Sequence, residues 1–193
     1  MSIREATGVD LAAIDDIYNH YVHTSTSTFQ VDPTTPEERR AWFAAHGPDH
    51  PVLVYEDAAQ DDAPGPPRGG PRVAGGRIAG WGSLNRYNPR EAYGHTVELS
   101  VYVRDERRGG GVGRALLTEL LAHARAVGHH VVLAQVSAEQ EASLALHRSF
   151  GFREVGRLRE VGYKFERWLD VVVFDLVIAG RRTRAPRSAT LMG

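Results

Sequence analysis

The sequence predicts an α/β protein built on one mixed sheet, and three observations support this. The expected elements follow one another as strand, two helices, three strands, helix, strand, helix and two strands. Polar and apolar residues alternate over residues 96–103, as in a strand with two different faces. A run of glycines then leads directly into an amphipathic helix. This order favours antiparallel hairpins at one end of the sheet and β-α-β connections in its middle.

The composition is that of an ordinary globular domain. The chain has 193 residues, of which 42% are hydrophobic and 24% are charged, and its formal net charge is -1. This charge gives no overall preference for nucleic acid or for an anionic membrane. The chain has no cysteine, which excludes disulfides, thiol catalysis and cysteine metal sites, and its nine histidines are too scattered to indicate a metal. Since no apolar signal or membrane-spanning stretch is found, we expect a cytoplasmic protein.

The first part of the chain is predicted to form a strand and two helices. Residues 2–6 are a strand candidate, and apolar side chains recur at helical spacing over residues 9–23. The β-branched and hydroxyl-bearing residues 24–28 should end this helix. A second helix is expected after Thr35, which has the side chain of an N-cap and precedes Pro36, a residue favoured in the first helical turn.

Strands and helices alternate after a segment rich in Pro, Gly and Asp. Residues 57–72 carry too little apolar surface to join a core, so we expect a flexible connection within a hairpin. Residues 1–178 are expected to form one domain, and residues 179–193 a disordered tail. The expected strands are residues 52–56, 72–84, 96–103, 130–137, 152–160 and 168–178, and the expected helices are residues 112–127 and 140–150.

A carboxylate lies in the middle of the predicted strand at residues 96–103. Because side chains alternate between the two faces of a strand, Glu98 shares its face with Ser100 and Tyr102, and valine and leucine side chains point to the other face. One interpretation is a half-solvated strand on which Glu98 is a surface residue. The other is the floor of a cleft in which Glu98 acts as a general base.

Four glycines, at positions 109, 110, 111 and 113, separate this strand from the next helix. Glycine allows a backbone to approach a ligand closely, and the unpaired N–H groups of a helix N-terminus bind anions. The Walker A pattern and the dinucleotide-binding pattern both fail here, since Arg114 stands where each requires another residue. Two interpretations remain: a phosphate-binding turn of another kind, or a glycine-rich turn that only leads into a core helix.

Several motifs together resemble a known enzyme family. The pattern Arg108-x-x-Gly111-x-Gly113, between a strand and a helix, resembles the acetyl-coenzyme A signature of the GNAT superfamily of N-acetyltransferases. Three longer segments resemble the phosphinothricin N-acetyltransferase family and follow one another in the same order as they do there. They are residues 17–43, 80–103 and 146–176. The resemblance covers roughly residues 3–178.

The resemblance implies a GNAT-like fold, which is a mixed, mostly antiparallel sheet with a central splay, flanked by helices. The cosubstrate is expected to be acetyl-CoA, with its pyrophosphate on the glycine turn and its pantetheine arm along the backbone of the Glu98 strand. The family usually has asparagine where this chain has Gln140. The residues implied for coenzyme binding are Val101, Val103, Arg108, Gly109, Gly110, Gly111, Val112, Gly113, Arg114, Gln140 and Ser143.

The implied reaction needs an amine that has lost its proton. An amine with a pKa of ~10.4 is mostly protonated at neutral pH, and its deprotonation costs roughly 4–5 kcal/mol. Glu98 matches the family's proposed general base, and a backbone N–H near Val101 is expected to stabilise the oxyanion. His147 occupies the position of a catalytic tyrosine in many GNAT enzymes. A lone histidine on such a helix is more often structural, whereas the resemblance implies an acid for the thiolate or a second base.

The implied acceptor is a small amino-acid analogue such as phosphinothricin, methionine sulfone or methionine sulfoximine. The residues matched to the family's acceptor site are Arg90, Tyr93 and Tyr102, and Phe29 is expected to close one wall of it. The arginine suits a bidentate contact with an acidic group, although its alternative is a surface ion pair with Glu37 or Glu91. A closed pocket near this arginine would indicate a small acceptor, and an open groove would indicate a peptide.

Two other functions stay open. The amine could belong to a peptide N-terminus or a polyamine, or the protein could be a non-catalytic acyl-CoA-binding module. We expect a homodimer, and no nucleic-acid or membrane partner. The residues near the C-terminal strands that match the family, Tyr163, Lys164, Phe165 and Trp168, are expected to serve packing or dimer contacts first.

Overall fold

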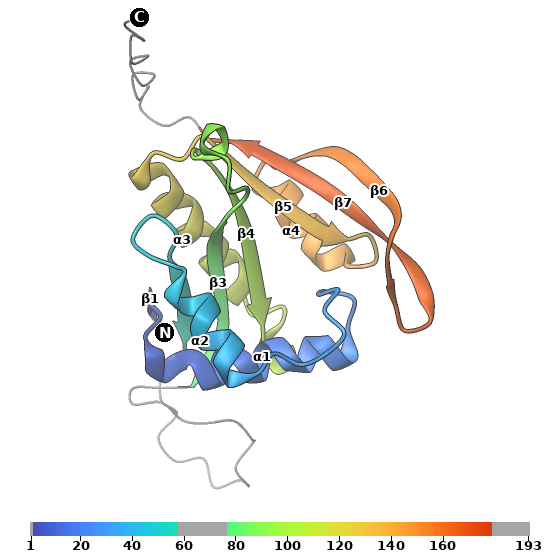
Figure 1. The fold of residues 1–193 in the computed structure, drawn as a ribbon, viewed down its shortest axis with the longest axis horizontal. Helices are drawn as coiled ribbons and strands as arrows, with labels where there is room; N and C mark the ends of the chain where they lie inside the picture. The colour runs from blue at the N-terminus through green and yellow to red at the C-terminus, as the bar shows by residue number, and fades with distance from the viewer. Residues whose placement is uncertain (1, 58–76, 179–193) are drawn as a thin grey trace, which may run out of the picture.

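The computed structural model describes residues 2–57 and 77–178, which form a seven-stranded sheet with helices on both faces (Figure 1). The strand order is β1-β2-β3-β4-β5-β7-β6. The strands are β1 (Ser2–Glu5), β2 (Val52–Glu56), β3 (Ile78–Arg86), β4 (Thr96–Val103), β5 (Val131–Ser137), β6 (Arg153–Lys164) and β7 (Arg167–Val177). The helices are α1 (Leu11–Thr24), α2 (Pro36–Ala44), α3 (Val112–Val127) and α4 (Glu141–Ser149).

The predicted mixed, mostly antiparallel sheet is confirmed. Only β4 and β5 pair in parallel, and the other neighbouring strands pair antiparallel. The predicted hairpin between β2 and β3 is also confirmed by their pairing. The connection predicted at residues 57–72 and the tail at residues 179–193 lie almost entirely outside the described residues.

The predicted boundaries were wrong mainly at the last hairpin. β6 continues past residue 160 to Lys164, because it stays paired with β7 as far as the pair Lys164–Arg167. The chain then turns at Phe165 and Glu166, whose φ angles are 52° and 60°. Since neither residue is a typical turn residue for positive φ, no local signal in the chain predicts so tight a turn there.

The sheet opens between β4 and β5. Their pairing covers only three positions and ends at the pair Glu98–Leu133. Beyond it, β4 stays paired with β3 up to Val103, and β5 stays paired with β7 up to Ser137. The facing edges of β4 and β5 therefore separate into a V (Figure 1), as the predicted central splay requires.

Each face of the sheet has its own apolar core. On one face, Leu116 and Leu120 of α3 pack against Val97 and Leu99 of β4. On the other face, α1 packs with Trp81 and its neighbours. α3 approaches β3 closely, because a Cβ at Gly82 would lie 2.8 Å from Leu120 Cδ1. Among the described residues, no helix is both long enough and apolar enough to cross a membrane.

Candidate active site

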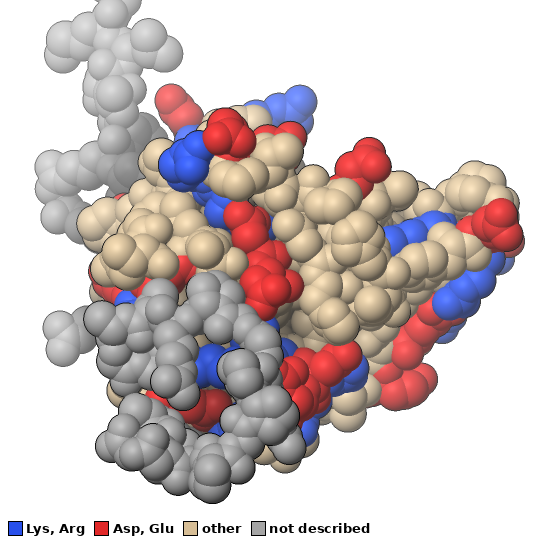
Figure 2. Space-filling model, turned by 90° about the horizontal axis from the view of Figure 1, so that it is seen from below, with Lys and Arg blue, Asp and Glu red and all other residues tan. Residues whose placement is uncertain are grey.

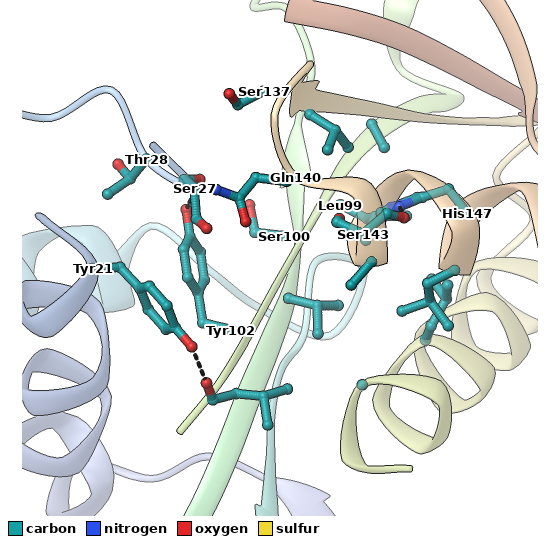
Figure 3. Close-up of a pocket in the computed structure, with 18 of the residues that line it drawn as sticks. Tyr21, Ser27, Thr28, Leu99, Ser100, Tyr102, Ser137, Gln140, Ser143 and His147 are labelled. Carbon is teal, nitrogen blue, oxygen red and sulfur yellow. Dashed lines mark hydrogen bonds between the residues drawn. The ribbon is translucent and has the colours of Figure 1, made fainter. Parts of the chain in front are cut away.

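A pocket of about 620 Å³ occupies the opening between β4 and β5 (Figure 3). Its walls come from the facing edges of these two strands, the glycine turn before α3, the first turns of α4, and the loop between α1 and α2. The loop contributes residues 26–29. Segments that are far apart in the sequence thus meet where β4 and β5 lose their pairing.

Glu98 stands at the point where the two strands separate. It is partly buried, and its Oε1 accepts a hydrogen bond from Gln135 Nε2 of β5 at 3.0 Å. Burial raises the pKa of Glu98 above its usual value, and the hydrogen bond from Gln135 opposes this shift. Glu98 is therefore half-buried on a central strand and lines the pocket, which supports the interpretation of a cleft floor over that of an ordinary surface residue.

A second pocket, of about 470 Å³, meets the first at Glu98, Ser100 and Tyr102. These three side chains share one face of β4, as the alternation predicted. The second pocket is walled by aromatic rings that include Trp42 and Trp81. Glu98 therefore lines both of the adjoining pockets.

The glycine turn leaves backbone donors without partners. Within residues 2–57 and 77–178, no acceptor is found for the amides of Gly109, Gly111, Val112, Gly113 and Arg114. By contrast, the amides of Arg108 and Gly110 bond to carbonyls of the preceding turn. Gly111 has a φ of 84° and is the N-cap of α3, and a Cβ there would meet no other atom within 4 Å. The turn is thus an open cradle of N–H groups, which suits an anion.

The inner edge of β4 has unpaired backbone groups that face the opening. The amide of Arg104 donates to the carbonyl of Ala79, so in this antiparallel register the backbone groups of Val101 and Val103 point away from β3. The Tyr21 hydroxyl donates to the Val103 carbonyl (Figure 3, dashed line). The backbone of Val101 is therefore free to pair with an extended ligand, whereas Val103 already shares its carbonyl with a side chain.

Gln140 reaches across the pocket mouth to the loop between α1 and α2. Its Nε2 donates to Ser25 Oγ at 3.2 Å and to Thr26 Oγ1 at 3.0 Å. In Figure 3 its side chain points from the start of α4 toward Ser27. Both Gln140 and Ser143 line the pocket. The amide of Gln140, which is longer than the asparagine usual in the family, is thus bonded to hydroxyl groups of the chain itself.

His147 lines the same pocket from the second half of α4. Its ring is buried, stacks on Phe174 at 5.7 Å and meets Phe152 edge-on at 5.2 Å. Nδ1 lies 2.8 Å from the carbonyl of Ser143, which can only accept, so Nδ1 carries a proton. Nε2 is buried and has no partner among the described residues. Burial lowers the pKa of His147, so the neutral ring is favoured and Nε2 keeps a lone pair.

The predicted acceptor residues separate into two groups. Phe29 and Tyr102 line the first pocket, and Tyr102 also lines the second. Arg90 and Tyr93 lie in the connection between β3 and β4, and neither lines either pocket. Tyr93 is 39% exposed and packs edge-on against Tyr87. The ion pair considered for Arg90 with a glutamate of α2 or of its own connection is not formed within the described residues.

Sequence reasoning missed two parts of the site. Gln135, which holds Glu98, lies on a strand whose polar residues carried no motif. The loop at residues 25–28 was interpreted only as the end of a helix, but Thr26, Ser27 and Thr28 form a wall of the pocket. The density of hydroxyl side chains there was the one available signal. No group of three or more potential metal ligands gathers in the described part of the chain.

The site combines an anion cradle at a helix N-terminus, an opened parallel strand pair and a carboxylate beside them, which is an arrangement that suits an extended anionic ligand along the sheet edge. The model of the acetyltransferase (GNAT) family matches residues 14–152. The chain belongs to this family, so the predicted family and its acetyltransferase class are confirmed.

The chain is similar over most of its length to three acetyltransferases with more specific descriptions. An L-methionine sulfoximine/L-methionine sulfone acetyltransferase of Pseudomonas paraeruginosa is 39% identical over 176 residues, which are 91% of this chain and 93% of that protein. A GNAT superfamily phosphinothricin acetyltransferase from Sinorhizobium meliloti, solved in complex with AcCoA, is 29% identical with a TM-score of 0.82, covering 97% of this chain and 94% of that one. A ribosomal-protein-alanine N-acetyltransferase structure from Brucella melitensis is 38% identical with a TM-score of 0.81, covering 92% and 100%.

Proposed function

We propose that the protein transfers the acetyl group of acetyl-CoA to the amine of a small amino-acid analogue, such as methionine sulfone, methionine sulfoximine or phosphinothricin. One observation carries this proposal: Glu98 lies where a coenzyme-sized pocket meets a second pocket. Both substrates can therefore be bound together, and the acetyl group passes directly from one to the other.

The residues of the first pocket fit acetyl-CoA. The free amides of Gly109 and of residues 111–114 suit its pyrophosphate, and glycine at position 111 keeps side-chain atoms away from it. The open edge of β4 at Val101 suits the amide groups of a pantetheine arm. Acetyl-CoA supplies an activated acyl group in its thioester. Its presence in the Sinorhizobium meliloti relative supports the same cosubstrate here.

Glu98 is the proposed general base. A protonated amine entering from the second pocket would meet a carboxylate that is already partly desolvated. A pKa raised by burial makes that carboxylate a stronger base than an exposed glutamate. Gln135 holds the carboxylate in place through Oε1, which leaves Oε2 to accept the proton directly or through a water. The Val101 N–H, which points away from β3, is the proposed donor to the negative charge that develops on the acyl oxygen.

His147 is the second proposed catalytic residue, and its surroundings favour a proton acceptor over a proton donor. Donation to a thiolate requires the imidazolium, which burial disfavours. Acceptance starts from the neutral ring, whose Nε2 has a free lone pair, although the same burial disfavours the imidazolium that forms. Of the two roles that the sequence left open, we propose the base, because the resting ring already has the lone pair that this role requires.

The acceptor is proposed to occupy the second pocket, with its amine at Glu98. Apolar rings there suit a methylene chain. The Arg39 guanidinium in the same wall is buried and already paired with Asp15 at 2.7 Å, so it adds positive potential to the pocket. The polar side chains of Gln30 and Ser100 are left to meet a carboxylate or a sulfone oxygen.

The Pseudomonas paraeruginosa relative, named for methionine sulfoximine and methionine sulfone, supports an acceptor of this size. Phe29 and Tyr102 are proposed to bound it, and Arg90 and Tyr93 would reach it only if their connection moved.

A peptide acceptor is the second candidate. It is favoured by the 38% identity to the ribosomal-protein-alanine N-acetyltransferase. Such an acceptor would also place its α-amine at Glu98, so the coenzyme site does not separate the two functions. The two acceptors differ in the rest of the molecule that carries the amine: a short polar side chain, or an extended backbone that must leave the pocket.

A homodimer is proposed through the hairpin of β6 and β7. This hairpin exposes Val161, Tyr163, Phe165 and Trp168, and the last of these is 62% exposed. Figure 2 shows a broad uncharged surface extending toward this end of the molecule, edged by acidic and basic side chains. Clustered apolar side chains of this size favour an interface. A cytoplasmic location is proposed from the sequence alone.

An acceptor screen tests the proposal. Release of coenzyme A from acetyl-CoA is followed with L-methionine sulfone, phosphinothricin, spermidine and a peptide that begins with alanine. We expect kcat/KM for the small analogues to exceed that for the peptide by roughly a hundredfold or more. A preference for the peptide would favour the second candidate, and coenzyme binding without turnover of any amine would favour a non-catalytic module.

A further inference from the structure

Lys164 is the only lysine in the chain, since the other 22 of the 23 basic residues are arginines. It is the last residue of β6 and is only 5% exposed. Lysine is rarely buried without a carboxylate partner, because its ammonium loses its hydration. The single lysine of the chain thus lies at a buried position, where its positive charge is costly in hydration energy.

The ammonium of Lys164 is held by backbone carbonyls. Nζ donates to the carbonyls of Ser25 and Thr28, each at 2.8 Å, and lies 3.4 Å from that of Tyr21. The Phe165 ring lies 5.0 Å from Nζ. Within the described ranges no carboxylate pairs with it. Burial lowers the pKa of Lys164, which is the mark of a cation held mainly by dipoles.

These carbonyls belong to the end of α1 and to the loop that walls the active site. The same loop is bound on its other side, because Gln140 donates to Ser25 and Thr26. Phe29 also packs directly against the hairpin, because a Cβ at Gly162 would overlap its ring. The loop is therefore fixed between α4 and the tip of the β6–β7 hairpin, with Lys164 as its charged anchor.

The cradle suits an ammonium better than a guanidinium. An ammonium is a compact group with three N–H donors that diverge in three directions, which matches three carbonyls arranged around one point. A guanidinium is planar and larger, and its donors lie in one plane. This difference accounts for the single lysine among so many arginines.

We propose that Lys164 is a positioning residue that fixes the loop at residues 25–29 and thereby sets the acceptor side of the active site. The inference rests on the proposed function in one respect, namely that Phe29 and Tyr102 bound the acceptor. The Tyr102 hydroxyl lies 3.5 Å from the Ser27 carbonyl. A shift of the loop would therefore change the surroundings of Tyr102, which lies on the same face of β4 as Glu98.

The kinetic test compares Lys164→Met with Lys164→Arg and with Arg159→Met, an exposed control on the same strand. We expect Lys164→Met to lower kcat/KM for methionine sulfone roughly tenfold or more, since a small misplacement of a substrate wall is enough to do so. We expect the KM for acetyl-CoA to change less than about threefold, because the loop does not form the anion cradle. Arg159→Met should match wild type.

The absence of cysteine allows a chemical rescue. In Lys164→Cys the new thiol is the only one, so alkylation with 2-bromoethylamine under denaturing conditions, followed by refolding, restores an ammonium at nearly the same distance. Wild type treated in the same way is the control. We expect the aminoethylated variant to regain at least about half of the wild-type kcat/KM, and Lys164→Arg to regain far less.

Hydrogen exchange gives a readout that needs no activity. In Lys164→Met we expect the amides of residues 25–29 to exchange roughly tenfold faster or more, while those of α3 keep wild-type rates. If no amine is acetylated, the proposed function fails but this test still decides the role of Lys164. Wild-type exchange of the loop in Lys164→Met, or full rescue by Lys164→Arg, would overturn the proposal.

Discussion

At the scale of single residues, Glu98 is held where its charge is unfavourable. It lies on a central strand, is partly buried, and receives one hydrogen bond, from Gln135. Its raised pKa results from that burial. Residues placed at a cost in stability are typical of active sites, since the same desolvation that destabilises the carboxylate makes it a better base.

This cost predicts how stability depends on pH. A carboxyl group whose pKa is raised by folding stabilises the protein below its unfolded pKa, and this contribution is lost as pH rises through its folded pKa. We therefore expect Glu98→Gln to melt roughly 1–3 °C above wild type at pH 7.5. The difference should vanish near pH 4.5, close to the ordinary pKa of the group.

Thermal melts of both proteins across this pH range provide the measurement. Glu139→Gln is the matched control, because the pKa of Glu139 is lowered by its ion pair with Arg167 and the sign is reversed. A Glu98→Gln variant that is less stable than wild type at neutral pH would mean that the carboxylate contributes to the fold.

At the scale of elements, the glycine turn and the start of α3 form the proposed anion site. The two ends of α3 are similar in backbone conformation, since Gly111 at the N-cap and Gly128 at the C-cap have φ angles of 84° and 96°. Of these two glycines, only Gly111 lines the pocket. Substituting each glycine in turn therefore separates the effect of backbone strain on stability from the effect on ligand binding.

We expect Gly111→Ala and Gly128→Ala each to lower stability by about 1 kcal/mol, because alanine is strained at positive φ. Only Gly111→Ala should weaken acetyl-CoA binding, by roughly tenfold, because its Cβ enters the cradle of free amides. Calorimetric titration with acetyl-CoA measures this difference. Equal affinities of the two variants for acetyl-CoA would show that the coenzyme does not bind at this turn.

The elements also show what sequence patterns could and could not predict. α3 matched its predicted bounds, because its glycine boundaries and apolar stripe are local signals. The role of Lys164 could not be predicted, since its partners lie more than 100 residues away in the sequence and are backbone carbonyls. Gln140 was matched by resemblance to a coenzyme contact. Its hydrogen bonds to Ser25 and Thr26 could not be predicted, because they depend on where the loop lies in three dimensions.

At the scale of the whole molecule, the sheet has two parts that meet at one short parallel pairing. The half containing β4 carries Glu98 and the aromatic second pocket, and the half containing β5, β6 and β7 carries Lys164, the proposed anchor of the loop. The proposed active site lies between the halves, so it depends on their relative position. That the described chain is one domain with a separate tail stays a prediction from sequence.

The exposed hairpin predicts the oligomeric state. We expect wild type to be a dimer and Trp168→Glu to be a monomer at micromolar concentration, because a charge at the centre of an apolar interface costs several kcal/mol. Val9→Glu, at a residue that is 70% exposed and lies near the other end of the sheet, is the control and should remain a dimer. Sedimentation analysis measures the mass, and a dimeric Trp168→Glu would place the interface elsewhere.

The central claim is that Glu98 takes the proton of an amine that meets acetyl-CoA at the opening between β4 and β5. The most direct measurement is the rate of coenzyme A release with L-methionine sulfone, for wild type and Glu98→Gln, together with the Kd of each for acetyl-CoA. For Glu98→Gln we expect kcat to fall roughly a hundredfold or more while the Kd for acetyl-CoA stays unchanged. A Glu98→Gln variant that turns over as fast as wild type would contradict it.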